Sequence, residues 1–178
     1  MSALHLTSPG ALTRSADAAD GYLVHRLYEK TPGYFDVISI PVPTLAEVET
    51  DLETAVRDSR RRTELVLLPA HERAPRAPDL QDPASGRQVV GYLDYKLDYP
   101  DSGDATVNLL LIDGALQGRG LGSRCVRDLE QRLHGRVRRV LASIYGQNPG
   151  ARRFWEALGY AFAIDAKPVL DWYAKQLA

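Results

Sequence analysis

The chain has 178 residues, of which 44% are hydrophobic and 25% are charged, and its formal net charge is −1. This composition is typical of one globular domain, and the near-neutral charge excludes a global electrostatic attraction to nucleic acid or to an anionic membrane. No apolar run approaches the roughly 18 residues of a membrane span, the N-terminus lacks a secretory pattern, and the single cysteine, Cys125, excludes an intramolecular disulfide. We therefore expect a single cytoplasmic domain over residues 1–178.

The N-terminal part predicts a short strand and then a helix. Leu4 and Leu6 alternate within residues 3–7, which indicates a strand. Apolar residues at helical spacing over residues 19–28 predict an amphipathic helix, which the segment Thr31-Pro32-Gly33 ends. Residues 34–40 are ambiguous between helix and strand.

A second helix is predicted to begin after Thr44. Thr44 and Glu47 have the spacing of a capping box, in which each side chain accepts a hydrogen bond from the other residue's backbone. The basic run 57–62 suits the end of a helix, and the acidic residues nearby argue against nucleic acid as its partner. The apolar positions expected on one side of this helix are Leu45, Val48, Leu52, Ala55 and Val56.

The middle of the chain predicts two strands separated by an irregular excursion. Residues 64–68 and 88–99 have strand character; the second places residues 93, 95, 97 and 99 on one face and Tyr92, Asp94, Lys96 and Asp98 on the other. Between them, residues 69–87 are rich in proline, charge and small residues, which predicts a flexible loop. Two roles stay open for it: a cover over a functional site, or a tolerated surface insertion.

The most informative stretch is a strand followed by a glycine-rich turn and a helix. The turn 101–104 leads into an apolar strand that ends at Ile112, the glycines follow at positions 118, 120 and 122, and an amphipathic helix covers residues 120–134. This order brings backbone N–H groups and the positive end of a helix dipole to one point, which favours phosphate binding. The spacing is neither G-x-x-x-x-G-K-[ST] nor G-x-G-x-x-G. A plain glycine turn between strand and helix is the alternative.

The C-terminal part predicts one more helix between strands. Residues 139–145 alternate as a strand, Asn148 followed by Pro149 has the pattern of a helix N-cap, and Gly159 ends that helix. Two final strands are expected at residues 161–164 and 169–173. The predicted order is strand, two helices, three strands, helix, strand, helix and two strands, which favours a mixed sheet with helices on both faces.

Two motifs in this order resemble the GNAT superfamily of acyl-CoA N-acyltransferases. Gln117-x-x-Gly120-x-Gly122 is similar to its pyrophosphate-binding signature, and Asn148-x-x-Ala151-x-x-Phe154-Trp155-x-x-x-Gly159-Tyr160 is similar to its later strand–helix unit. The resemblance implies an α/β, single-domain GNAT-like fold with a central mixed, mostly antiparallel sheet flanked by helices on both faces. It also implies an N-acetyltransferase that moves an acetyl group from acetyl-CoA to an amine by direct attack in a ternary complex.

The resemblance also assigns a cofactor site. The fourth strand would hold the pantetheine arm and the acyl carbonyl, the loop would hold the pyrophosphate, and the later helix would wall the arm. An equally open alternative is that Arg119 points to solvent, and the N-cap role alone would explain Asn148. The expected cofactor-binding residues are Leu110, Leu111, Ile112, Gln117, Gly118, Arg119, Gly120, Leu121, Gly122, Ser123, Asn148 and Trp155.

Two positions depart from the family pattern. Thr106 stands where many members carry a glutamate as general base, and Trp155 stands where a tyrosine often protonates the leaving thiolate. Asp94 and Asp98 are weak substitutes for the base and are better explained as a solvated strand face. Tyr145 is the best alternative proton donor, with a packing role equally open. Cys125 is expected in the core, not as a nucleophile.

The sequence therefore predicts an acetyl-CoA-dependent N-acetyltransferase without a metal, since the four histidines show no metal-ligand spacing. The alternative is a non-catalytic CoA-binding sensor or a degenerate GNAT domain. A nucleotide-binding α/β protein lacks the expected lysine or acidic ribose partner. The amine acceptor, small molecule or protein, is not identified, and a homodimer is left open.

Overall fold

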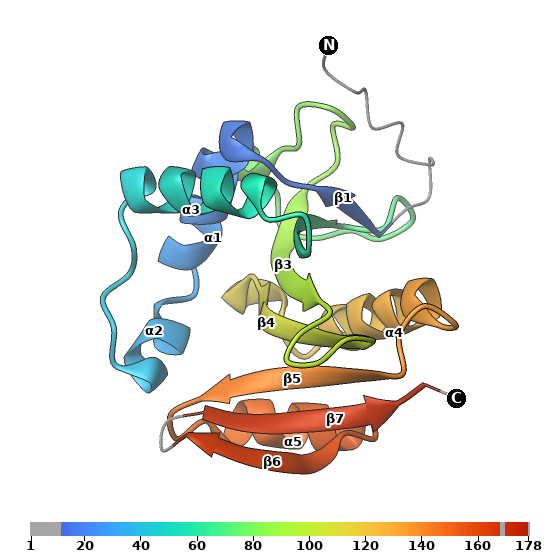
Figure 1. Cartoon of the computed structure of the whole chain (residues 1–178). Coiled ribbons are helices and arrows are strands. Elements are labelled where there is room, and N and C mark those ends of the chain that lie inside the picture. Colours follow the sequence, from blue (N-terminus) through green and yellow to red (C-terminus); the bar gives the residue numbers. More distant parts are fainter. Residues whose placement is uncertain (1–11, 168–169, 178) are drawn as a thin grey trace.

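The computed structural model describes residues 12–167 and 170–177 (Figure 1). The strand expected at residues 3–7 lies outside these ranges. None of the helices described is long and apolar enough to cross a membrane. With η for a short 3-10 helix, the elements are β1 (Thr13–Ser15), η1 (Ala18–Asp20), α1 (Gly21–Glu29), α2 (Pro32–Ile38), α3 (Leu45–Arg57), β2 (Arg61–Leu67), η2 (Pro78–Leu80), β3 (Val89–Leu97), β4 (Asp104–Ile112), η3 (Gly114–Leu116), α4 (Leu121–Leu133), β5 (Arg139–Tyr145), α5 (Pro149–Ala157), β6 (Ala161–Lys167) and β7 (Leu170–Gln176).

The described strands form one seven-stranded sheet in the order β1-β2-β3-β4-β5-β7-β6. All neighbouring strands pair antiparallel except β4 and β5, which run parallel (Figure 1). A parallel pair needs a crossover connection, and α4 supplies it between these two strands. The mixed, mostly antiparallel sheet expected from the sequence is confirmed.

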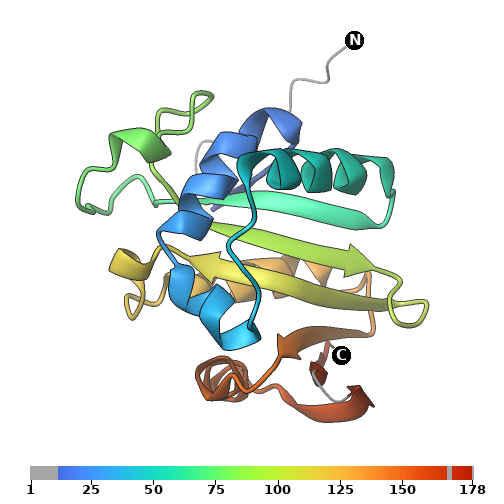
Figure 2. The same ribbon diagram turned by 90° about the vertical axis from the view of Figure 1, so that its left-hand side faces the viewer.

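Helices cover both faces of this sheet, as expected. Figure 2 shows α1, α2 and α3 in front of the strands and α4 behind them. One hydrophobic cluster joins the helices α1–α3 to the sheet, and a second joins α4 and α5 to the opposite face. The central strand β3 contributes to both: Val89 and Tyr92 face the first cluster, and Val90 and Leu93 face the second. Its sequence is apolar without a break at this point because both of its faces are buried.

The segment that the sequence left ambiguous is helical. Helix α1 ends at Glu29, and α2 begins at Pro32, so Thr31-Pro32-Gly33 ends one helix and starts the next. The hydroxyl of Thr31 donates to the carbonyl of Leu27 at 2.9 Å, which satisfies one of the last acceptors of α1. Proline suits the first position of α2 because its missing N–H would have no intrahelical partner there.

The capping box of α3 is confirmed. The hydroxyl of Thr44 accepts from the backbone N–H of Glu47 at 3.3 Å, and the glutamate accepts from the N–H of Thr44 at 2.7 Å. Val48, Leu52 and Ala55 are buried, whereas Val56 is 63% exposed, contrary to the expected apolar side. One residue along a helix turns the side chain by about 100°, which carries Val56 past the edge of the buried stripe.

The proline-rich excursion is attached to the body of the protein at several points. Leu80 is completely buried in the cluster under α1–α3, and Asp82, also completely buried, pairs with Arg14 at 2.7 Å. Closer to β2, Glu72 pairs with Arg124 of α4. Composition alone could not indicate these attachments because each is made by an isolated residue in an irregular segment.

Gly91 allows β3 and β4 to approach closely. A Cβ atom at this position would lie 2.4 Å from the carbonyl oxygen of Leu111 and 2.8 Å from Cδ1 of Ile112. Gly91 pairs with Ile112, the last residue of β4. The missing side chain therefore sets the position of the end of β4, from which the glycine loop starts.

We expect Gly91→Ala to lower the free energy of unfolding by about 1–3 kcal/mol, because backbone and side chain must move to admit one methyl group. Gly33→Ala is the matched control: nothing lies within 4 Å of its Cβ position in α2, and alanine favours helix by up to about 1 kcal/mol. Urea denaturation of both variants measures the difference. Equal stability of Gly91→Ala and the unmodified chain would contradict the close approach.

Candidate active site

The cavity of this protein lies where β4 and β5 stop pairing, next to an irregularity in the pairing of β4 with β3. Asp94 of β3 pairs with Leu109 of β4, and the next residue of β3 pairs with Val107, so Asn108 is an extra residue that forms a β-bulge. The parallel pairing of β4 with β5 extends only to Val107 and Ala142. Beyond that pair, the remaining parts of both strands line opposite sides of one cavity.

This cavity, of about 850 Å³, contains nearly all of the residues that the sequence predicts for the site. The α2 helix adds Gly33, Tyr34 and Val37 to its walls, and β5 adds Ser143. The predicted residues that line it are Leu110, Leu111, Ile112, Gln117, Gly118, Gly120, Leu121, Gly122, Ser123, Tyr145, Asn148 and Trp155.

The glycine loop has the backbone conformation of an anion site. Gly118 and Gly120 have φ values of 76° and 77°, in the left-handed region that glycine adopts without steric cost. Gly120 is the N-cap of α4 and provides no side-chain oxygen for the first N–H groups of that helix. These donors, together with the positive end of the helix dipole, face the position that an anion would take.

The other two motif residues of the loop have packing roles. The side-chain amide of Gln117 donates to the carbonyl of Ile112 at 3.0 Å and so closes the loop against the end of β4. Gly122 needs to be small because a Cβ atom there would lie 3.3 Å from the ring of Phe154 in α5. The motif thus combines a backbone donor site with the contacts that hold it in place.

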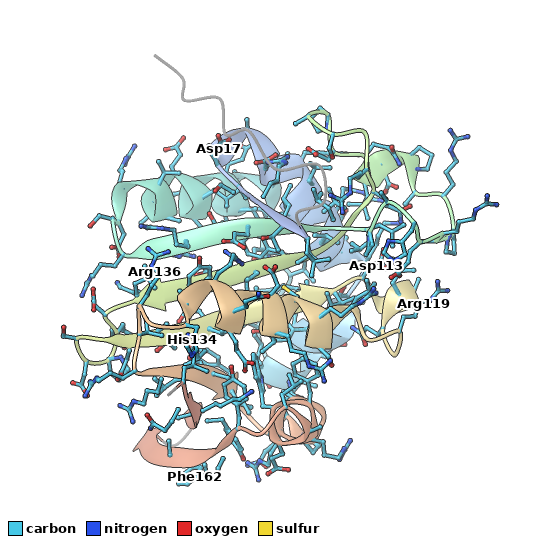
Figure 3. All side chains as sticks on the ribbon, turned by 90° about the vertical axis from the view of Figure 1, so that its right-hand side faces the viewer. Asp17, Asp113, Arg119, His134, Arg136 and Phe162 are labelled. Carbon is cyan, nitrogen blue, oxygen red and sulfur yellow. The ribbon has the colours of Figure 1, made fainter. Side chains whose placement is uncertain are left out.

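Arg119 is the one predicted residue that does not line the cavity. Arg119 is exposed, and Figure 3 shows it at the outer edge of the molecule beside the loop. Arg119 therefore lies in the solvent-exposed position that the sequence left open as an alternative. A second arginine near the loop, Arg124 in the first turn of α4, is paired with Glu72 of the proline-rich segment, and this pairing lowers the pKa of Glu72.

Asn148 and Trp155, the predicted site residues of the second motif, also have structural roles. Asn148 caps α5 by accepting a hydrogen bond from the N–H of Ala151 at 2.9 Å, as predicted. Trp155 is only 5% exposed, and its ring lies edge-on between Phe154 and Tyr160, with centroids 5.1 Å and 4.8 Å away. Trp155 is thus chiefly a core residue with one edge on the cavity, and its neighbour Phe154 also lines the wall.

Two tyrosines also line the cavity. Tyr145, the last residue of β5, is 43% exposed. Tyr34 of α2 is more buried; desolvation, with a smaller contribution from Tyr145, raises the pKa of Tyr34 to about 12. Sequence reasoning missed Tyr34 because it left residues 34–40 unassigned, although Pro32 was a usable signal for a helix start.

The position assigned to the family's general base is not in the cavity. Thr106 is completely buried, and its hydroxyl donates to the carbonyl of Tyr99 at 2.6 Å. Two residues later on the same strand, Asn108 does line the cavity. The bulge explains the difference, because the extra residue changes which side chains of β4 reach the cleft, and a single sequence gives no clear sign of a bulge.

The expected solvated face of β3 is correct for Asp98 and wrong for Asp94. Asp98 is exposed in the turn before β4, and its carboxylate accepts from the N–H of Gly103 at 2.8 Å. Asp94 is only 4% exposed, because α3 covers this part of the sheet; Arg61 of β2 donates both to Asp94 and to Asp51 of α3. A period of two shows which residues share a face but not whether a helix covers it.

Two other expectations concern cysteine and metals. Cys125 is completely buried in the cluster under α4, and burial raises the pKa of its thiol to about 12, so the prediction of a core cysteine is confirmed. Within residues 12–167 and 170–177, no group of three or more histidine, cysteine or acidic side chains has a geometry that could hold a metal ion.

Comparisons with solved structures identify the fold. An acetyltransferase from Thermus thermophilus is 38% identical, with coverage of 93% of this chain and 96% of that chain and a TM-score of 0.80. A spermidine N-acetyltransferase from Vibrio cholerae is 13% identical, with coverage of 93% and 94% and a TM-score of 0.68. An acetyltransferase of ribosomal protein L7/L12 from Salmonella typhimurium is 14% identical, with coverage of 93% and 94% and a TM-score of 0.72. At such low identities, the last two show likeness of fold alone.

The sequence comparisons give the family. A search of curated proteins found no match. The model of the "Acetyltransferase (GNAT) family" matches residues 45–160, which is more than half of the chain and includes both motifs. The match and the 38% identical structure together confirm the resemblance seen in the sequence. The chain belongs to the GNAT acetyltransferase family.

Proposed function

We propose that this protein transfers the acetyl group of acetyl-CoA to an amine, by direct attack of the amine within a ternary complex. The observation that carries the proposal is the cavity between β4 and β5, which is lined both by a glycine loop with the backbone conformation of an anion site and by two tyrosines. A cofactor laid along it would have its pyrophosphate on the loop and its thioester near the bulge. A ligand that joins a pyrophosphate to a thioester through a long arm would match this arrangement.

The binding part of the proposal relies mainly on backbone groups. Residues 110–112 would offer peptide groups to the pantetheine arm, and the loop from Gln117 to Ser123 would hold the pyrophosphate. Asn148 would contact the arm where the two strands separate, and Trp155 would contribute its exposed edge. CoA is present in the structures of similar fold from Vibrio cholerae and of the aminoglycoside acetyltransferase, which supports CoA as the ligand here.

The chemical part requires a new C–N bond and the loss of a C–S bond. The lone pair of a neutral amine attacks the thioester carbon, the C–S bond breaks, and the thiolate takes up one proton while the nitrogen loses one. We assign the donated proton to Tyr145, whose phenol lies on the cavity at the end of β5. Holding both reactants in line supplies much of the rate enhancement, so a strong base is not required.

The range of candidate amine acceptors can be narrowed by experiment. The similar folds include proteins that act on an N-terminal serine of a ribosomal protein, on spermidine and on aminoglycosides. We would first measure binding of CoA and acetyl-CoA by calorimetry, and then release of free CoA with a tripeptide amide, spermidine and kanamycin. Binding with turnover supports the proposal; binding without turnover favours the CoA-binding sensor, and no binding refutes both.

The first prediction from this proposal concerns the loop. Gly120→Glu should raise the Kd for CoA and acetyl-CoA alike by about a hundredfold or more, roughly 3 kcal/mol, because a carboxylate would meet the pyrophosphate. Gly135→Glu is the matched control, since Gly135 has a φ of 73°, no atom within 4 Å of its Cβ position and no place in the cavity wall. It adds the same charge and backbone strain elsewhere. Similar affinities of the two variants in calorimetry would refute the pyrophosphate site.

The second prediction concerns the proton donor. Tyr145→Phe should lower turnover at saturating acetyl-CoA by more than about tenfold, roughly 1.4 kcal/mol of barrier, and leave CoA affinity nearly unchanged. Tyr34→Phe is the control, because Tyr34 lines the same cavity, and we expect it to retain more activity. If both variants keep full turnover, water protonates the thiolate; if Tyr34→Phe alone loses activity, Tyr34 is the donor.

A further inference from the structure

The bulge of β4 places one polar residue, Asn108, on the wall of the cavity. Asn108 is the extra residue of the bulge, is partly buried and lines the same cleft as Tyr34 of α2 and the end of β5. Its side-chain amide donates to Oδ1 of Asp94 at 3.2 Å. The function proposed above does not use this side chain, although it belongs to the bulge beside which the thioester would lie.

An ionic network fixes the position of Asp94, the hydrogen-bond partner of Asn108. Arg61 donates from Nε to Oδ1 and Oδ2 of Asp94 at 3.3 Å and 3.0 Å, and its Nη1 and Nη2 donate to Asp51 of α3 at 2.9 Å and 2.7 Å. The guanidinium holds the Asp94 carboxylate in place, and a carboxylate accepts hydrogen bonds but donates none. Asp94 is therefore a fixed acceptor beneath the floor of the cleft.

This acceptor determines which way the carboxamide of Asn108 faces. An asparagine side chain has NH₂ on one corner and a carbonyl oxygen on the other, and only the NH₂ can bond to Asp94. The carbonyl oxygen is then at the corner that does not bond to Asp94, on a residue that lines the cavity. The cleft thus has an oriented hydrogen-bond acceptor beside the bulge, and the ionic network beneath it imposes the orientation.

We propose that the carbonyl oxygen of Asn108 binds an N–H of the attacking amine, with Asp94 as the positioning residue that orients it; this inference rests on the function proposed above. A hydrogen bond from N–H to the amide oxygen directs the nitrogen lone pair toward the thioester carbon. As the C–N bond forms, the nitrogen becomes positively charged, so the same hydrogen bond strengthens in the transition state. The amide oxygen does not remove the proton, which passes to water, while the electron pair of the broken C–S bond leaves on sulfur.

The test uses hydroxylamine as the acceptor, because it is small, neutral near pH 7 and independent of the contacts that a natural acceptor makes. Its product with acetyl-CoA, acetohydroxamate, is measured by the colour of its iron complex. We expect Asn108→Ala to lower the enzyme-dependent rate by about tenfold or more, with CoA affinity unchanged, because the lost hydrogen bond is to a developing charge. The control is Thr106→Val on the same strand, which removes a hydrogen bond outside the cavity and should keep the rate of the unmodified protein.

A second variant tests the positioning role. Asp94→Asn allows either corner of Asn108 to face the network, so we expect a smaller loss of rate than in Asn108→Ala, expressed in kcat with little change in the KM for acetyl-CoA. Thermal unfolding records separately any stability lost with the Arg61 pair.

Three results would overturn the inference: an unchanged rate in Asn108→Ala, equal losses in Asn108→Ala and Thr106→Val, or no acceleration of the hydroxylamine reaction by unmodified protein that binds acetyl-CoA. The proposed cofactor site fails independently, in the calorimetry, if the unmodified protein binds no CoA.

Discussion

The different pairing of β4 on its two sides is the constraint on which the rest of the structure depends. On one side, β4 pairs with β3 through Ile112 with one extra residue at Asn108; on the other, it pairs with β5 only through Val107. Because β5 is parallel, the chain must cross back over the sheet, and α4 makes that crossing directly after the loop. The cavity, the glycine loop and the position of the first turn of α4 all follow from this pairing.

Local signals in the sequence were enough to predict most of this arrangement. The capping box at Thr44, the N-cap at Asn148 and the strand 139–145 depend on neighbours within a few residues, and each has the predicted bounds or contacts in the structure. The glycine loop belongs to the same class, since Gly118 and Gly120 adopt the left-handed conformation for which glycine is suited. Local chemistry therefore predicts the order of elements from α3 onward and the conformation of the glycine loop.

The expectations that were wrong or missing depend on tertiary packing and not on local sequence. The burial of Asp94, the position of Thr106 and the contribution of Tyr34 to the cavity depend on how α2, α3 and the bulge are packed against the sheet. Such packing joins residues that are far apart in the chain, so strand alternation or helical period cannot reveal it. The ion pair between Asp94 and Arg61 is an example, because it joins residues that are 33 positions apart in the chain.

The cavity has walls of two different kinds. The wall at the glycine loop is largely backbone and rests on the cluster under α4, whereas the wall at α2 consists of side chains such as Tyr34 and Val37, the latter 40% exposed. A backbone surface keeps its donors through most substitutions, while a side-chain surface changes with each one. Since separate hydrophobic clusters support the two walls, mutations in α2 can accumulate without disturbing the packing beneath the loop. Substitutions in α2 can therefore change one wall of the cavity without altering the backbone donors of the other.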